Sequence, residues 1–225
     1  MGQKVHPIGF RLGIVEDWRS RWYARKKEFG AMLVADKKVR DCIKEEYAFA
    51  GVSRIDIERT REIVRVTLHC ARPGVIIGRK GAEVERLRSR LEEIVGGKVD
   101  IAIKEIPRPE LDAQLVAEAI AEQLSKRASF KRTIRRAAET TMAAGAKGVR
   151  IRIAGRLGGA EMSRREMVSI GSLPLHTIRV RVSYGFAEAI TTYGKIGIKV
   201  WINQGDVSDE QQSAEAKEPA RAVDA

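Results

Sequence analysis

Residues 71–81 read ARPGVIIGRKG, and this stretch joins a predicted strand to a predicted helix. Within it Gly78 and Gly81 flank Arg79 and Lys80, after a short apolar run and before a pattern of apolar residues at helical spacing. Two glycines at this spacing let the backbone turn tightly and approach a partner without interference from a Cβ atom. The free N–H groups of the following helix and the two cationic side chains favour an anionic partner.

The elements around this loop follow a recognisable order. Apolar spacing predicts helices over residues 25–47 and 84–95, and alternation of apolar and polar residues predicts strands near 54–58, 64–70 and 99–103. Helix, strand, strand, short helix, glycine loop, helix and strand is the order of a KH domain, whose Gly-x-x-Gly loop clamps about four nucleotides. The alternative is a plain turn between two helices, and the surrounding order favours the KH interpretation.

The second half of the chain has a different pattern. It follows Pro107-Arg108-Pro109, which marks the best domain boundary. Helices are predicted over residues 110–127 and 130–142, and strands around 149–153, 162–170, 178–182 and 196–202. Two helices followed by four strands indicate an antiparallel sheet backed by helices. The expected fold class is therefore α+β: a KH domain and a two-helix, four-stranded antiparallel domain. The predicted parts are an irregular N-terminal arm (1–24), the KH domain with its leading helix (25–107), the C-terminal domain (108–205) and a disordered acidic tail (206–225).

The charge distribution points to a polyanion as partner. The 225 residues include 42 Lys and Arg against 30 Asp and Glu, a net charge of +12; residues 1–205 carry +16 and residues 206–225 carry −4. Such an excess suits nucleic acid or an acidic membrane surface. No apolar run approaches the roughly 20 residues that a transmembrane helix needs, so we expect RNA rather than a membrane.

A second group of cations lies beyond the KH region. Lys126, Arg127, Lys131, Arg132, Arg135 and Arg136 occur with no acidic residue among them, and several recur every four residues, which predicts one basic helix face. The alternative is a solvated helix face, but such faces usually contain interspersed Glu. The candidate RNA-binding residues are Gly78, Arg79, Lys80 and Gly81 in the loop, Arg127, Lys131, Arg132, Arg135 and Arg136 on the helix, and Arg150, Arg152, Arg156, Arg164, Arg165, Arg179 and Arg181 on the sheet and its loops. For the strand residues Arg150, Arg152, Arg179 and Arg181 a plain polar sheet face is an equal alternative.

Other kinds of function find little support in the sequence. His6, His69 and His176 are scattered without metal-ligand spacing, and no catalytic triad or pair of carboxylates stands out. The P-loop and dinucleotide-binding patterns are not met. We therefore expect a protein that is not an enzyme, with no catalytic residues, no metal, no cofactor and no small-molecule substrate. Aromatic residues make up 5% of the chain, so recognition should depend on phosphate charge and backbone N–H groups more than on stacking.

Several short segments, taken together, resemble one known family, the bacterial small-subunit ribosomal protein number three. They are residues 1–7 (MGQKVHP), 11–13 (RLG), 71–81, 109–113 (PELDA), 155–161 (GRLGGAE), 173–177 (LPLHT) and 191–194 (TTYG). The resemblance covers residues 1–205 and implies a type II KH domain followed by an α+β domain. It also implies binding to 16S rRNA in the head of the small subunit, next to other subunit proteins, in the cytoplasm.

The resemblance further implies contact with messenger RNA where it enters the ribosome. Lys131, Arg132 and Arg135 match the basic helix to which the family assigns that role. The main alternative is a free-standing KH regulator that binds transcripts away from the ribosome. Cosedimentation with the small subunit in high salt would distinguish the two.

Overall fold

The computed structural model describes residues 4–60 and 63–206, and the chain divides into two compact units. One unit runs from Trp18 to Arg108. The other combines the residues up to Asp17 with those from Pro109 onward. From residue 207 onward, the predicted disordered tail lies outside the residues that the structure describes. None of the helices within 4–60 and 63–206 is both long enough and apolar enough to cross a membrane.

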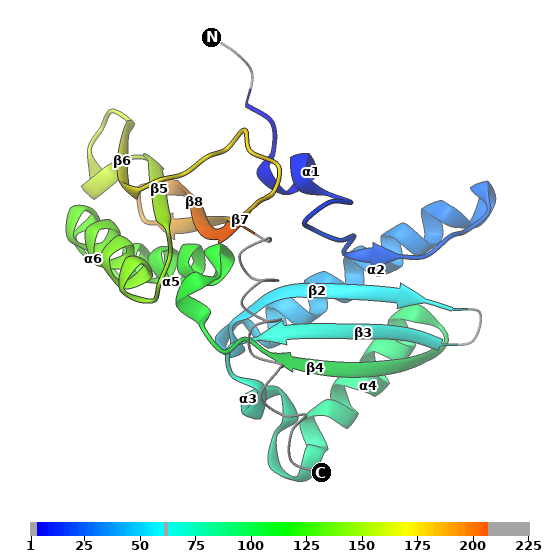
Figure 1. The fold of residues 1–225 in the computed structure, drawn as a ribbon. Helices are drawn as coiled ribbons and strands as arrows, with labels where there is room; N and C mark the ends of the chain where they lie inside the picture. The colour runs from blue at the N-terminus through cyan, green and yellow to red at the C-terminus, as the bar shows by residue number, and fades with distance from the viewer. Residues whose placement is uncertain (1–3, 61–62, 207–225) are drawn as a thin grey trace, which may run out of the picture. The chain divides into compact units, whose positions relative to one another are not determined.

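The unit from Trp18 to Arg108 is a sheet with helices on one face (Figure 1). Its elements are β1 (Ser20–Arg21), α2 (Lys26–Glu46), β2 (Val52–Arg59), β3 (Ile63–Cys70), α3 (Pro73–Ile77), α4 (Ala82–Val95) and β4 (Lys98–Glu105). The strands lie in the order β1-β2-β3-β4. β2 and β3 are antiparallel, whereas β1 is parallel to β2 and β4 is parallel to β3.

The core of this unit lies between the sheet and its helices. Alternate residues of β2 and β3 are buried, which explains the period-two pattern in the sequence. The fully or almost fully buried side chains are Val39, Ile43, Ile55, Ile57, Val66, Leu68, Ile76, Leu87 and Leu91. Burial of each large apolar side chain contributes about 1.5 to 3 kcal/mol, so this core fixes how α3 and α4 present the glycine loop between them.

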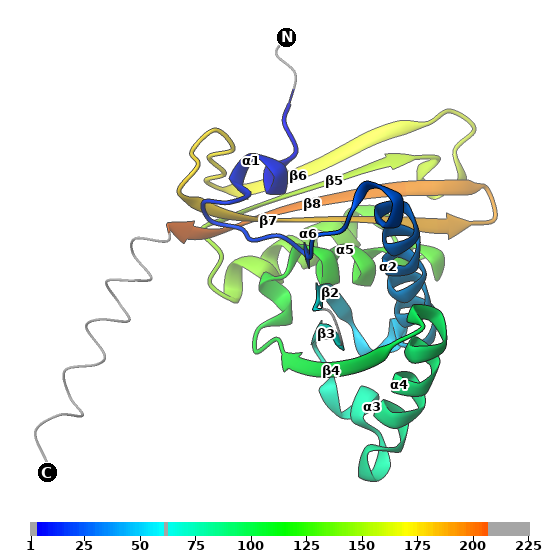
Figure 2. The same cartoon turned by 90° about the vertical axis from the view of Figure 1, so that its right-hand side faces the viewer.

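The other unit is a sheet between helices and the N-terminal segment. Its elements are α1 (Pro7–Arg11), α5 (Ala113–Ser125), α6 (Phe130–Ala143), β5 (Gly148–Gly155), β6 (Arg164–Gly171), β7 (Val180–Thr191) and β8 (Gly194–Asp206). The strands lie in the order β6-β5-β8-β7, all antiparallel to their neighbours. α5 and α6 cover one face, and α1 lies against β7 on the other (Figure 2). The predicted two-helix, four-stranded antiparallel arrangement is confirmed.

The first residues of the chain contain more structure than the sequence indicated. They were expected to form an irregular arm, but residues 7–11 form α1, and residues 20–21 form β1, which is parallel to β2. The prediction of irregular structure is therefore wrong at these two places. The expected arm is divided between the two units because α1 packs on β7, whereas β1 extends the other sheet.

Arg11 attaches the N-terminal segment to the C-terminal sheet. Its side chain is fully buried, and its guanidinium donates hydrogen bonds to five backbone carbonyl groups. The acceptors are the carbonyl oxygens of Pro7, Pro174, Leu175, Thr177 and Val180, at 2.6 to 3.3 Å. Burial lowers the pKa of Arg11, and the negative charge of Glu16 opposes this effect. His6 adds an edge-on ring contact with Tyr184, at 4.8 Å between centroids.

Candidate nucleic-acid interface

The glycine loop depends on backbone conformations that other residues adopt with difficulty. Gly78 ends α3 at φ 68° and ψ −171°, and Gly81 precedes α4 at φ 81°. A Cβ atom on Gly78 would lie 2.5 Å from Cγ of Glu83, whereas one on Gly81 would meet no atom within 4 Å. Gly78 is therefore required by both conformation and space, and Gly81 by conformation alone.

The charge around this loop is partly balanced. Arg79 is exposed, and the side chain of Lys80 is not among those that the structure describes. Glu83 and Glu85 lie in the first turn of α4, where they interact favourably with the positive end of the helix dipole. Two carboxylates close to the N–H groups that would face a phosphate reduce the attraction of the loop for RNA.

Helix α6 has the opposite character. Lys131, Arg132, Arg135 and Arg136 are exposed, while the buried face of the helix carries Thr133, Ile134, Ala138 and Thr141. None of the four cations has an ion pair or side-chain hydrogen bond with a residue in the described part of the chain. The first turn of the helix has no acidic residue. These four predicted site residues therefore form one uncompensated surface, which we call the basic face.

Arg127 does not belong to this helix, and its predicted place on the helix is wrong. α5 ends at Ser125, α6 begins at Phe130, and Arg127 lies between them at φ 60°. Its N–H donates to the carbonyl of Leu124, and the N–H of Ala128 donates to that of Gln123, which is the Schellman ending of a helix. Glycine usually occupies this left-handed position. Arg127 is exposed, and a side chain other than that of glycine in this conformation carries a cost in backbone strain.

The sheet cations Arg150 and Arg152 lie on the face away from α5 and α6. They alternate with Val149, Ile151 and Ile153, whose side chains are fully buried. In the sheet register their neighbours on β8 are Trp201 and Lys199, respectively. The buried Nε of Arg150 has no hydrogen-bond partner within residues 4–60 and 63–206. A buried donor without a partner is costly, so an acceptor on a bound molecule would stabilise this position.

The remaining predicted arginines differ in their surroundings. Arg164 and Arg165 are exposed at the start of β6. Arg181 is half-buried in β7, but Arg179 precedes that strand, so its predicted place on a strand face is wrong. The reason is that β7 begins only at Val180, after the turn that Arg11 holds. Arg156 is engaged within the domain, since its Nε donates to the carbonyl of Ala160 at 2.9 Å.

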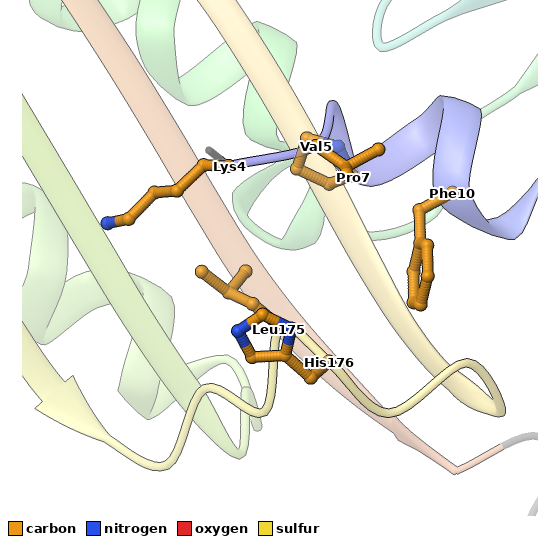
Figure 3. Close-up of a pocket in the computed structure, with 6 residues that line it drawn as sticks. All are labelled: Lys4, Val5, Pro7, Phe10, Leu175 and His176. Carbon is orange, nitrogen blue, oxygen red and sulfur yellow. The ribbon is translucent and has the colours of Figure 1, made fainter. Parts of the chain in front are cut away.

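A small pocket lies beside α1, where the sequence predicted nothing. It is lined by Lys4, Val5, Pro7 and Phe10 from the N-terminal segment and by Leu175 and His176 from the loop between β6 and β7 (Figure 3). Its volume of about 70 Å³ is far below the roughly 300 to 1,000 Å³ of pockets that hold small molecules. We therefore assign no ligand to it. Among the described residues no group of three His, Cys, Asp or Glu could hold a metal ion.

The geometry of the glycine loop and of the basic face defines a class of protein. A Gly-x-x-Gly loop between two helices on a four-stranded sheet, together with an uncompensated basic face, is typical of RNA-binding proteins with a KH domain. A family model described as "KH domain" matches residues 38–111, and one described as "Ribosomal protein S3, C-terminal domain" matches residues 120–202.

Curated relatives named "Small ribosomal subunit protein uS3" cover nearly the whole chain. The one from Rhodopirellula baltica is 54% identical over 222 residues, which is 96% of this chain and 94% of the relative. The one from Desulforudis audaxviator is 55% identical over 215 residues, with 96% and 99% covered. The one from Xanthomonas axonopodis pv. citri is 52% identical over 218 residues, with 97% and 89% covered.

The chain belongs to the small ribosomal subunit protein uS3 family. This membership confirms the resemblance found in the sequence and the KH and S3 C-terminal domains expected from it. Members of the family are structural, non-enzymatic ribosomal proteins, which confirms the predicted class and the ribosomal location.

Proposed function

We propose that this chain is a structural component of the small-subunit head that binds 16S rRNA and contacts messenger RNA where it enters the ribosome. The observation that supports this most strongly is the basic face of α6. Lys131, Arg132, Arg135 and Arg136 are exposed and lack carboxylate partners among the described residues. A phosphate backbone supplies the missing negative charge.

The physical argument rests on the cost of like charges on one helix. Lys131 and Arg135, and likewise Arg132 and Arg136, are separated by four residues, and each such pair destabilises an isolated helix by about 0.2 to 0.5 kcal/mol. RNA binding removes this repulsion and releases the counterions condensed on the RNA. The match of Lys131, Arg132 and Arg135 to the family's messenger-contacting helix supports the proposal that this face lies on the messenger path.

The other candidate residues are proposed to anchor the protein to rRNA. Arg150 and Arg152 extend a cationic surface over the sheet face opposite α6, and Nε of Arg150 is buried without a hydrogen-bond partner among the residues that the structure describes. Both glycines of the Gly78–Gly81 loop have positive φ angles and leave room for a phosphate to approach the backbone, but the balanced charge of the loop favours a weaker contact than that of α6. Neighbouring subunit proteins are proposed as further partners of the assembled protein.

The test compares two triple variants of the full chain. Replacing Lys131, Arg132 and Arg135 with Ala should weaken binding of single-stranded RNA. The slope of log affinity against log salt should fall by about 0.7 per lost phosphate contact, or about 2 in total. The matched control removes three exposed cations of α2, Lys27, Lys38 and Lys44, and should leave that slope nearly unchanged.

Two outcomes would contradict the proposal. An unchanged salt slope in the α6 variant would show that the basic face does not bind RNA. An equal fall in both variants would show that only net charge matters. Small subunits reconstituted with the α6 variant should also translate a structured messenger more slowly than wild-type subunits, with an unstructured messenger as reference.

A further inference from the structure

Tyr193 is an exposed aromatic residue at the turn between β7 and β8. The turn is fixed by a hydrogen bond from Oγ1 of Thr191 to the carbonyl of Gly194, at 2.7 Å. Tyr193 keeps 57% of its surface exposed although it lies in a well-defined turn. An aromatic side chain that is both held and exposed is suited to contact with another molecule.

The ring of Tyr193 is held by two neighbours in sequence-distant positions. A Cβ atom on Gly159 would lie 2.9 Å from Cε2 of the ring, so the ring packs directly on the main chain of the turn at residues 157–159. The guanidinium of Arg156 lies over the ring, 5.5 Å from its centroid. Arg156 also donates to the carbonyl of Tyr193, at 3.4 Å, and to that of Ala160. Arg156 therefore acts as a positioning residue for this ring.

The same turn connects the ring to the basic face. A Cβ atom on Gly158 would lie 3.8 Å from Cε1 of Phe130, the first residue of α6. Phe130 is followed directly by the exposed cations Lys131 and Arg132. The turn at residues 157–159 thus has the start of α6 on one side and Tyr193 on the other, which places an exposed ring beside the start of the basic face.

We propose that Tyr193 stacks a base of the single-stranded RNA whose phosphates bind the basic face of α6. The inference rests on the proposed function, since the basic face supplies the phosphate contacts. Proteins that bind single-stranded RNA combine aromatic rings with a row of cations, because the bases stack on the rings while the cations bind the phosphates of the backbone. The bases of a duplex are already paired and stacked, so the site selects unpaired RNA. Every base has a π-face, so one ring accepts any sequence.

The test uses the full chain with a short unstructured RNA and with an otherwise identical RNA that has abasic positions. Tyr193→Leu keeps an apolar side chain against Gly159 but removes the π-face, and it should weaken binding of the ordinary RNA by about 5- to 150-fold, the range for loss of one stacked base. Tyr193→Phe should retain the wild-type affinity. All three proteins should bind the abasic RNA equally. Tyr23→Leu is the matched control, since Tyr23 is 95% exposed in the other unit, and it should change neither affinity.

Three results would overturn the proposal: unchanged binding by Tyr193→Leu, equal weakening toward ordinary and abasic RNA, or loss of binding by Tyr193→Phe. Should Tyr193→Leu fail to fold, ultraviolet cross-linking of 5-iodouridine RNA to the wild-type chain decides instead, and absence of a cross-link at Tyr193 would count against stacking. If the α6 triple variant loses RNA binding but Tyr193→Leu binds RNA like the wild type, only the stacking role of Tyr193 is rejected. No effect of the α6 variant would reject the proposed function itself.

Discussion

The Gly78–Gly81 loop and helix α6 both offer cations to RNA, but they depend on different properties of the chain. In the loop, Gly78 and Gly81 adopt positive φ angles, and Glu83 and Glu85 at the start of α4 offset the local positive charge. In α6 the backbone is ordinary helix, and the exposed cations have no partner among the described residues. The loop is therefore specified by conformation and the helix by charge.

The two regions should therefore respond differently to substitution. A single added methyl group disturbs the loop. The fold of α6, in contrast, tolerates any helix-forming side chain at an exposed position, and only its buried face restricts the size of the side chain. Conversely, a change of charge affects α6 in both stability and binding, and salt weakens its contacts with RNA.

The largest effect is expected from Gly78→Ala. The new Cβ would lie 2.5 Å from Cγ of Glu83, at a φ and ψ combination that is almost restricted to glycine. We expect a loss of about 2 to 4 kcal/mol in the free energy of unfolding of this unit, measured by urea denaturation. Gly81→Ala adds the same methyl group at a positive φ angle but meets no atom, so it should lower the free energy of unfolding by only about 1 to 2 kcal/mol.

Equal losses from the two substitutions would show that packing against Glu83 does not distinguish the glycines. Gly78→Ala combined with Glu83→Gly separates the two causes, because it removes both Cγ and Cβ of residue 83 and leaves the backbone strain at residue 78. Glu83→Gly alone is the reference for the cost of a glycine in the first turn of α4.

A smaller effect on stability, present in α6 and absent in the loop, is expected from replacing an arginine with glutamate. Arg132→Glu converts a repulsive pair with Arg136 into an attractive one and places a carboxylate in the first turn of α6. The free energy of unfolding should rise by about 1 kcal/mol, while RNA affinity falls. Arg79→Glu adds a third carboxylate near Glu83 and Glu85, so stability should not rise.

Thermal unfolding and RNA titration of both glutamate variants measure these changes. A stabilised Arg79→Glu protein would mean that the loop is as uncompensated as the helix, and the contrast between the two regions would be lost.

The smallest expected effect concerns the turn between α5 and α6. Arg127→Gly relieves a left-handed conformation and should raise the free energy of unfolding by about 0.5 to 1 kcal/mol. It should also reduce the salt slope of RNA binding by about 0.7 if Arg127 contacts a phosphate. Arg127→Ala removes the same charge without relieving the backbone, so it should lower the slope without stabilising the protein. A destabilised Arg127→Gly protein would contradict the strain assigned to this residue.

The elements that sequence patterns located well are those with one buried face. Ile55 and Ile57, or Val149 and Ile151, alternate with polar residues because each strand packs one face on helices. The helix after the glycine loop was likewise found from its apolar spacing. Such patterns are local, so the sequence displays them directly.

The sequence patterns fail at two kinds of position. At one kind, a helix ends without a residue that marks its end; at the other, the residues in contact are far apart in the sequence. The end of α5 lacks the glycine that would mark it, so the four-residue spacing of Arg127 and Lys131 predicted that Arg127 shares the basic helix face, whereas it lies in the turn before α6. The contact of Tyr193 with Gly159 joins residues far apart in the sequence, and spacing cannot show it. The burial of Arg11 depends on carbonyl groups near residue 175, so a residue type usually exposed became part of the core.

The position of Arg11 also has a consequence for biosynthesis. Arg11 is made early, but the carbonyl groups of Pro174 and Val180 that hold it are made 163 and 169 residues later. At about 5 to 20 residues per second, the guanidinium waits in water for roughly 10 to 30 s while the unit from Trp18 to Arg108 can complete its own sheet. The N-terminal segment is therefore fixed only after translation has passed Val180, and a chain that stops earlier keeps this segment undocked.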